Sequence, residues 1–241
     1  MCGRYASVSS HNDLIALFKV DASQSDPELP PDYNMAPTKT SPVILARPPR
    51  DDRDADPIRQ LRNLVWGLVP SWAKDRSIGS RMINARAETV TEKPSFRKAF
   101  ATRRCIIPAD GFYEWLPTNR TGRTGKPVKQ PYFIHHADGT LLAFAGIYEF
   151  WKDPTATGDD AWLSTFAIIT TTATDTVGRI HDRMPMAINN TWWSDWLDPA
   201  TPATQALTLM APPDDLDIYT VSTAVNNVHN NGPALIQPAE Q

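Results

Sequence analysis

The 241-residue chain contains only two cysteines, too few for a disulfide scaffold. It has no CxxC pair and no cluster of cysteine and histidine with metal-ligand spacing, so we expect no metal and no cofactor. No apolar run reaches the 18 residues that a membrane span requires, and the first residues have no apolar segment of signal-peptide type. We therefore expect a cytoplasmic protein with free thiols and no membrane contact.

A strong net charge is also lacking. The 24 basic and 27 acidic side chains leave a formal charge of -3, so overall charge gives no attraction to nucleic acid. The distribution is uneven, however, because residues 74–104 hold nine basic side chains against three acidic ones. Such a stretch is either a solvated charged surface or a local binding face for phosphate groups.

Elements of the predicted fold are short, because the 22 prolines interrupt both helices and interior strands. Ser9 or Ser10 can cap a helix whose apolar positions run from Leu14 to Phe18. Further short helices are expected near 93–100, 174–180 and 191–197. Strands are expected over 43–47, 61–69, 105–109, 112–116, 132–137, 141–148 and 163–171.

The order of these elements predicts the fold class. Strands and helices do not alternate, which favours an α+β fold with a curved, mainly antiparallel β-sheet, a barrel-like core and short flanking helices. Length and composition suit one domain over residues 1–241. Asp138-Gly139 predicts a β-hairpin between 132–137 and 141–148. The polar segments 48–57, 117–130 and 152–160 are expected to be surface loops.

Cys2 carries the most distinctive chemistry of the sequence. If Met1 is removed, Cys2 has both a thiol and a free α-amine, a pair that no internal cysteine possesses. The amine has an ordinary pKa of about 7.7 to 8 and the thiol one of about 8.5. Such a 1,2-aminothiol condenses with an aldehyde, first to a Schiff base and then to a five-membered thiazolidine ring. We therefore expect the Cys2 end of the chain to be exposed.

Three other residues offer groups that could assist Cys2. Asn84 brings an amide and lies within the basic stretch, whereas Glu114 stands between aromatic residues that can raise the pKa of a carboxyl group. His181 brings an imidazole that titrates near neutrality. Each of these signals, considered alone, is weak, because a lone histidine usually has a structural role and a glutamate such as Glu114 can simply pair with an arginine.

Six segments in a fixed order are more specific than any single residue. They are Met1 to Tyr5, Tyr33 to Pro37, Trp66 to Trp72, Asn84 to Thr89, Ala109 to Trp115 and His181 to Pro185. In this order the sequence closely resembles the SRAP family, the SOS response-associated peptidase domain. The resemblance extends from Cys2 to about Gln237, and therefore over nearly the whole chain.

The resemblance implies a function in DNA damage. Members of the family bind single-stranded DNA and crosslink to abasic sites through the N-terminal cysteine. By this resemblance Cys2 is the nucleophile, Asn84 orients its amine, Glu114 transfers protons and His181 assists ring opening of the sugar as a general acid. The resemblance further implies a set of DNA-binding residues, namely Arg4, Asn34, Trp72, Arg86, Thr170 and Arg183, with Trp66 as an alternative to Trp72 for base stacking.

Other functions remain open at this point. Lyase activity through the Schiff base and autocatalytic removal of Met1 would accompany the same chemistry. Met-Cys-Gly also begins N-terminal-nucleophile amidohydrolases of the glutaminase type, in which the thiol attacks an amide. A third possibility is a noncovalent single-stranded DNA-binding module. We expect a monomer, with abasic single-stranded DNA as its partner and with no protein partner evident in the sequence.

Overall fold

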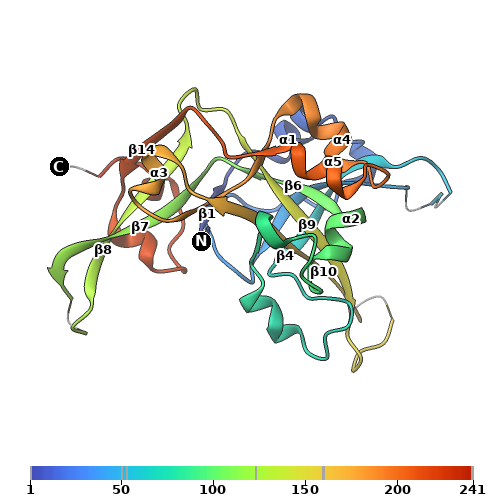
Figure 1. Ribbon diagram of the computed structural model, residues 1–241, viewed down its shortest axis with the longest axis horizontal. Helices are drawn as coiled ribbons and strands as arrows, with labels where there is room; N and C mark the ends of the chain where they lie inside the picture. Colours follow the sequence, from blue (N-terminus) through green and yellow to red (C-terminus); the bar gives the residue numbers. More distant parts are fainter. Residues whose placement is uncertain (1, 50, 53, 123, 159–160, 240–241) are drawn as a thin grey trace.

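The computed structural model describes residues 2–49, 51–52, 54–122, 124–158 and 161–239. In this part of the chain, two mainly antiparallel sheets are flanked by short helices (Figure 1). The strands are β1 Tyr5–Ser7, β2 Asp32–Met35, β3 Thr40–Arg47, β4 Ile58–Trp66, β5 Asn84–Arg86, β6 Arg104–Ala109, β7 Gly111–Thr121, β8 Pro127–His136, β9 Leu142–Lys152, β10 Trp162–Thr172, β11 Arg183–Pro185, β12 Ala187–Ile188, β13 Met210–Ala211 and β14 Leu216–Thr220.

The helices are short and lie mostly outside the sheets. The α-helices are α1 His11–Phe18, α2 Arg97–Thr102, α3 Asp175–Gly178, α4 Trp193–Leu197 and α5 Ala203–Thr208. Short 3-10 helices are η1 Ala22–Gln24, η2 Arg76–Arg81, η3 Ala87–Thr89, η5 Asn190–Trp192, η6 Thr223–Asn226 and η7 Pro233–Ile236. None of the described helices is long and apolar enough to cross a membrane.

Five strands of the larger sheet close into a barrel. Antiparallel pairs join β4 to β3, β3 to β6, β6 to β9 and β9 to β10, and a parallel pair between β10 and β4 completes the ring. The predicted α+β fold with a barrel-like, mainly antiparallel core is therefore confirmed. Each barrel strand contributes alternate residues to one hydrophobic cluster, including Val43, Leu64, Ile107, Phe144 and Phe166.

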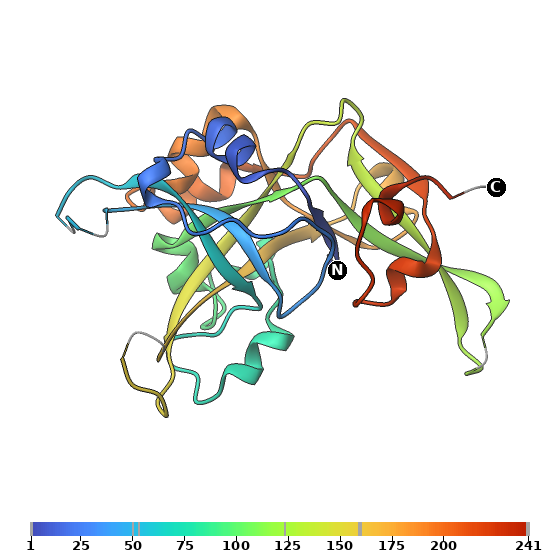
Figure 2. The same ribbon diagram turned by 180° about the vertical axis from the view of Figure 1, so that it is seen from behind.

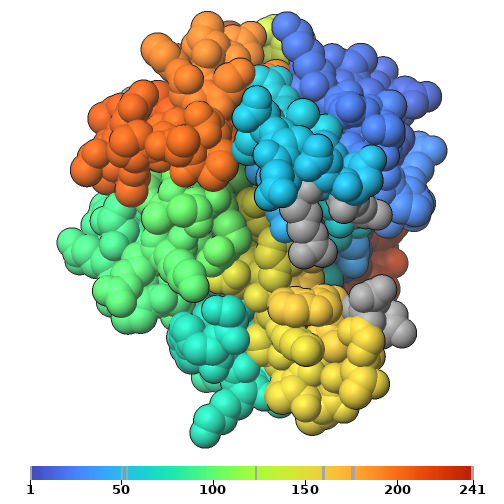
Figure 3. All heavy atoms as spheres, turned by 90° about the vertical axis from the view of Figure 1, so that its right-hand side faces the viewer, coloured from blue at the N-terminus to red at the C-terminus, as the bar shows by residue number. Residues whose placement is uncertain are grey.

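Short helices cover the outer face of the barrel. Leu14 and Phe18 of α1, Phe100 of α2 and Trp196 of α4 are buried against the opposite face of the strands, in a cluster that includes Ile44. Burial of each such side chain contributes about 1.5 to 3 kcal/mol to stability. Figure 3 shows the helical segments on this side of the molecule, with the region of α2 next to that of α5.

The N-terminal strand links the barrel to the smaller sheet, whose order is β14-β8-β7-β1-β2. Tyr5 of β1 pairs with Phe112 of β7 and with Met35 of β2. Figures 1 and 2 both show β1 near the centre of the molecule, and it lies within the smaller sheet between β7 and β2. The segment that follows Cys2 is consequently held inside the structure rather than at its periphery.

Two local predictions are wrong. The chain does turn near Gly139, whose φ is 74°, but β8 and β9 enter different sheets and do not form a hairpin. β8 pairs instead with β7, so most of the segment 117–130 is a β-hairpin and not a loop. The sequence signal at Asp138-Gly139 reports a local turn, whereas the strand partners are set by packing between distant segments.

Two glycines place the strand that carries Asn84. The chain leaves β4 after Trp66 and returns as β5, and both β4 and β5 run parallel to β10. The segment that connects the two strands, residues 67–83, is here called the excursion. Within it Gly67 and Gly79 meet backbone to backbone, and a Cβ atom on Gly79 would lie 2.5 Å from the Gly67 oxygen. Gly67 also has a φ of 125°, which L side chains rarely adopt.

Candidate active site

Two of the four predicted catalytic residues, Glu114 and His181, line one open pocket of about 730 Å³ together with the three predicted arginines. We call it the central pocket. Residues from both sheets and from the connecting segments form it. Its lining comprises Gly3, Arg4, Arg86, Glu114, Trp115, Lys129, His181, Asp182, Arg183 and Asn226. Four of these residues are arginine or lysine and two are acidic, so the lining carries an excess of positive charge.

Cys2 lies next to the central pocket, but its side chain does not face solvent. The thiol is 0% exposed and packs in the same hydrophobic cluster as Tyr5 and Trp66. The expectation of an exposed Cys2 end is therefore wrong for this structure. Burial raises the pKa of the Cys2 thiol, and the nearby negative charge of Glu114 raises it further. The thiol is accordingly protonated near neutral pH.

Asn84 contacts the Cys2 backbone directly. Its Nδ2 atom donates a hydrogen bond of 2.8 Å to the Cys2 carbonyl oxygen. The strand β5 that carries Asn84 pairs with Ile168 of β10, so the amide is held on a rigid element. Its other polar atom, Oδ1, is buried and has no hydrogen-bond partner among the described residues.

Glu114 is the buried acid of the central pocket. It belongs to β7, where it pairs with Tyr132 of β8, and it is 3% exposed. Desolvation raises the pKa of Glu114 to about 7, because an ionised carboxylate loses its hydration there. The carboxyl group is therefore partly protonated near neutral pH and can both accept and donate a proton.

His181 reaches the pocket from the segment before β11. Its Nδ1 lies 3.0 Å from the backbone nitrogen of Arg183 and 2.9 Å from an Asp182 carboxylate oxygen. A neutral imidazole accepts the first contact, whereas an imidazolium donates to the second. Desolvation lowers the pKa of His181, which favours the neutral form. We assign the neutral ring proton to Nε2, because Nδ1 then accepts from the Arg183 N–H.

Arg183 is held by protein groups. Its Nη1 and Nη2 atoms donate to the two Glu88 carboxylate oxygens over 2.6 and 3.0 Å, and Nη2 also donates to the Thr170 carbonyl oxygen. The ion pair lowers the pKa of Glu88 to about 2. Thr170 is 1% exposed and does not line the central pocket. The guanidinium therefore links η3, β10 and β11 beside His181.

Arg4 and Asn34 form another internal link. Arg4 donates from Nη1 to the Asn34 side-chain oxygen and, over 2.9 Å, to the Val225 carbonyl oxygen, and its guanidinium lies 5.6 Å from the centroid of the Trp115 ring. Asn34 is 0% exposed, and its amide donates to backbone carbonyls of the C-terminal segment, including that of Asn230. Arg4 faces the pocket, whereas Asn34 lies behind it.

Trp72 lies outside the central pocket. It is 59% exposed and borders another hollow together with Arg97 and Lys98 of α2. Trp66, the alternative stacking residue, is fully buried, and its indole N–H donates to the Ile83 carbonyl oxygen. The described residues thus offer an exposed aromatic face at Trp72 but none at Trp66.

The basic stretch 74–104 does not form one surface. Arg86 reaches the central pocket, whereas Arg97 borders the hollow beside Trp72. Arg103 pairs with Glu149 at 2.7 Å. Arg104 is buried, and its guanidinium donates to backbone carbonyl groups around α4. Part of the local charge excess is therefore structural.

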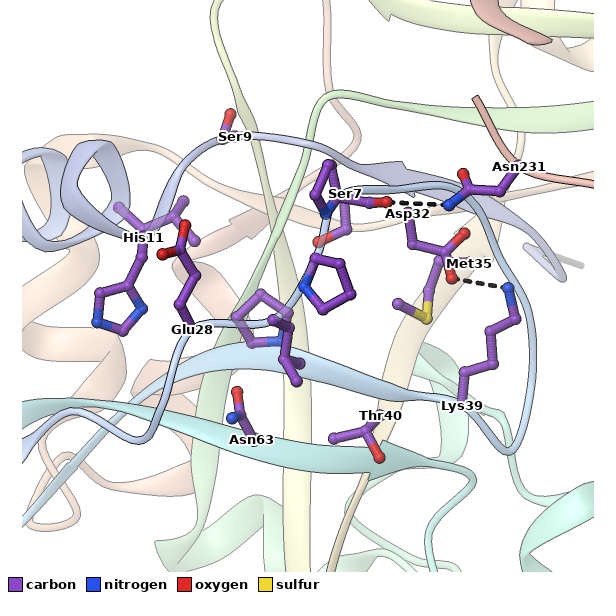
Figure 4. Close-up of a pocket in the computed structure, with 15 residues that line it drawn as sticks. Ser7, Ser9, His11, Glu28, Asp32, Met35, Lys39, Thr40, Asn63 and Asn231 are labelled. Carbon is purple, nitrogen blue, oxygen red and sulfur yellow. Dashed lines mark hydrogen bonds and ion pairs between the residues drawn. The ribbon is translucent and has the colours of Figure 1, made fainter. Parts of the chain in front are cut away.

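A separate hollow of about 220 Å³ lies beside α1 and β2 (Figure 4). Its polar side chains include His11, Glu28 and Asn63, and Lys39 pairs with Asp32 at 2.7 Å on its rim. It contains none of the residues that the sequence predicts to be catalytic. In the described residues, no three side chains of His, Cys, Asp or Glu gather in a metal-ligating cluster.

Five lining residues were not predicted from the sequence, and three of them, Gly3, Trp115 and Asp182, lie inside the recognised motifs. Trp115 follows Glu114 directly and was part of the recognised motif, so its place could have been anticipated. Lys129 and Asn226 reach the pocket only because β8 pairs with β7 and because η6 packs against β8. The sequence contains no local signal for these long-range contacts.

The fold and the central pocket define an α+β protein in which a near-terminal cysteine adjoins a cationic pocket with a buried acid. A model of the SOS response associated peptidase (SRAP) family matches residues 1–228, and the chain belongs to this family. The resemblance seen in the sequence motifs is thereby confirmed.

Curated relatives carry names that refer to abasic sites. The chain is 40% identical over 240 residues to the abasic site processing protein YoqW of Bacillus subtilis (strain 168), with 98% of this chain and 99% of the relative covered. It is 35% identical to the abasic site processing protein HMCES of Mus musculus, with 87% and 65% covered. A solved structure from Bacteroides thetaiotaomicron matches 99% of this chain with a TM-score of 0.77 and 25% identity.

Proposed function

We propose that this protein binds single-stranded DNA that contains an abasic site and captures the lesion covalently through Cys2. The observation that carries this proposal is the grouping of Glu114, His181 and Arg86 around the pocket that adjoins Cys2. Relatives named as abasic site processing proteins support the class of lesion. An abasic sugar presents an aldehyde in its ring-opened form, which is the reactant that an aminothiol requires.

The reaction consists of two bond-forming steps after Met1 has left. The Cys2 amine attacks the aldehyde carbon, and loss of one water gives a Schiff base. The Cys2 sulfur then adds to the same carbon, and the thiol proton passes to the nitrogen. The product is a thiazolidine, and one water is released in total. Because the amine attacks first, the protonated and buried state of the thiol is compatible with this order.

Glu114 is the proton carrier of this scheme. A carboxyl group with a pKa of about 7 can protonate the departing hydroxyl in the dehydration step and accept a proton from the attacking amine. Glu114 lines the pocket that adjoins Cys2, and this position supports the role. General acid–base catalysis of this kind typically contributes about 10²- to 10⁴-fold to a rate.

His181 assists opening of the sugar ring. Its Nε2 proton is directed by the hydrogen bond that Nδ1 accepts from Arg183, so Nε2 can donate to the ring oxygen of the sugar. The lowered pKa of His181 makes the imidazolium scarce near neutrality, which assigns the larger share of proton transfer to Glu114. Arg4 and Arg86 supply positive charge for the phosphates on either side of the lesion.

Intact mass measurement tests the proposal. After incubation with an abasic single strand, the wild-type protein should give a species equal to protein plus strand minus one water, and this species should persist in denaturant. Cys2→Ala should give none, whereas Cys105→Ala should behave as wild type because Cys105 is a buried internal cysteine. Persistent capture by Cys2→Ala would overturn the proposal.

Two further activities follow from the same chemistry. Removal of Met1 by the protein itself, in which one water hydrolyses the Met1–Cys2 bond, is the peptidase reaction we propose. Purified protein that still carries Met1 should then lose it on incubation without any other enzyme, as followed by intact mass. Strand incision by β-elimination at the Schiff-base stage is the proposed lyase reaction. It should yield a shortened strand on a denaturing gel, and borohydride should trap its imine as a stable amine.

A further inference from the structure

The β7–β8 hairpin extends beyond the rest of the smaller sheet. β1 pairs only with Gly111 and Phe112 of β7, and β14 pairs only with residues 132–136 of β8. The part that projects past these neighbours, residues 116–122 and 124–130, is here called the arm. Figures 1 and 2 both show it standing away from the body of the molecule, on the side opposite α1.

The arm has a defined structure of its own. Pro117 pairs with Lys129 and Thr121 pairs with Pro127 across the hairpin. The Thr118 hydroxyl donates to the Val128 carbonyl oxygen over 2.8 Å, and the Gly122 N–H donates to the Lys126 carbonyl oxygen over 2.8 Å. At about 3.3 Å per residue, the seven steps from Glu114 to Thr121 span about 23 Å. The arm is thus long enough to follow a polymer well beyond the central pocket.

All charged side chains of the arm are basic. Residues 117–130 include four basic side chains and no acidic one. One of the four, Arg123, lies outside the described residues. The other three, Arg120, Lys126 and Lys129, are exposed, and within the described chain none of them forms an ion pair. Their charge is therefore available to an external anion.

The arm begins at the central pocket. Glu114 and Trp115 lie at its base on β7, and Lys129 on β8 lines the same pocket. A strand that passes Trp115 and Lys129 on leaving the pocket continues onto the arm. Lysine and proline often prevent a free strand edge from pairing with another chain. In the arm Pro117 and Pro127 already do this, so the basic side chains are not needed for that purpose. Three described basic side chains, with no acidic side chain among them, lead away from a cationic pocket and therefore indicate binding of a polyanion.

We propose that the arm binds the phosphodiester backbone of the single strand on one side of the central pocket, through Arg120 and Lys126. This inference rests on the proposed function, because it takes the occupant of the pocket to be single-stranded DNA. The arm contacts phosphates and does not read bases, so it lengthens the bound segment without adding sequence preference. It also holds a damaged strand before and after the covalent step.

Salt dependence of noncovalent binding tests the arm. The wild-type protein and its variants are titrated with intact single strands, free of abasic sites, of about 5 and about 16 nucleotides. On the longer strand, Lys126→Gln should reduce the slope of log K against log salt by about 0.7, and adding Arg120→Gln should reduce it by about 1.4 in total. On the shorter strand, both variants should match the wild type.

Lys19→Gln is the charge-matched control, since Lys19 is an exposed residue that directly follows α1, a helix on the side of the molecule opposite the arm. It should leave both slopes unchanged. Equal slopes for the wild type and the double variant on the longer strand would overturn the proposal that the arm binds the DNA backbone. Because the DNA contains no abasic site, the salt titration is independent of covalent capture. If the arm variants change the slope but the wild-type protein fails to capture an abasic strand, only the proposed Cys2 chemistry is refuted.

Discussion

Asn84 donates a hydrogen bond of 2.8 Å to the carbonyl oxygen of Cys2 and so ties β5 to the start of the chain. The same amide has a buried Oδ1 atom without a partner among the described residues. A buried, unsatisfied polar atom of this kind costs about 1 to 3 kcal/mol. An α-amine on Cys2 is a donor that would satisfy it. The position of Asn84 thus fits the role of orienting that amine.

Replacement of Asn84 by alanine should slow covalent capture. One lost hydrogen bond of about 1 kcal/mol corresponds to a rate about fivefold lower. Single-turnover capture of an abasic strand measures the effect. Asn63→Ala is the control, because Asn63 makes a similar bond to the Pro27 carbonyl oxygen away from the central pocket. Equal rates for Asn84→Ala and Asn63→Ala would contradict the role of Asn84.

Glu114 should determine the pH dependence of capture. With a pKa of about 7, its protonated form declines above neutrality, so the wild-type rate profile should contain a limb with a midpoint near pH 7. Glu114→Gln should remove this limb and lower the rate about 10²-fold or more. Glu28→Gln, in the separate hollow of Figure 4, should retain both the limb and the rate. A persistent limb in Glu114→Gln would assign it to another group.

The same buried acid should limit stability at high pH. The folded protein retains the Glu114 proton up to about pH 7, whereas the unfolded chain releases it near the ordinary value of 4.5. Unfolding free energy therefore falls as pH rises from about 4.5 to about 7, by up to about 3 kcal/mol. Glu114→Gln should be more stable than wild type at pH 8 and similar to it at pH 4. Urea unfolding at the two pH values checks this sign.

The sequence predicted the individual strands better than their partners. Period-two patterns and proline positions located most of the barrel strands, and the side-chain hydroxyl of Ser10 caps α1 as expected. The pairing of β8 with β7 was not predicted, because strand partners depend on packing between distant segments. A turn signal at Gly139 cannot distinguish a hairpin from a crossing between sheets.

For the site, the order of the motifs along the chain was more informative than the type of any single residue. Glu114 and His181 came from the family resemblance, and the structure places both at the central pocket. Burial could not be predicted from one sequence, so Cys2 was expected to be exposed and is instead packed in the core. Lys129 was missed because it reaches the pocket only through long-range strand pairing.

Glu88 should support the fold at neutral pH and lose this effect in acid. Its pKa is lowered to about 2 by the Arg183 ion pair, so its contribution is complete above about pH 4.5 and disappears as pH falls to about 2. Glu88 is 46% exposed, so solvent screening reduces the contribution to about 1 kcal/mol. Glu88→Gln should lose this amount at pH 7, as measured by urea unfolding. An equal deficit at pH 2 would contradict the ion-pair explanation.

The contact between Gly67 and Gly79 should be needed to place Asn84. A Cβ atom on Gly79 would lie 2.5 Å from the Gly67 oxygen, a backbone atom that cannot rotate away. Gly79→Ala should therefore cost about 1 to 3 kcal/mol in thermal or urea unfolding. Capture should slow as well, because displacement of the excursion moves β5 relative to Cys2. Gly178→Ala is the matched control, since its nearest contact would be an ordinary 3.4 Å. If Gly79→Ala equals Gly178→Ala in both stability and capture, the excursion does not position Asn84.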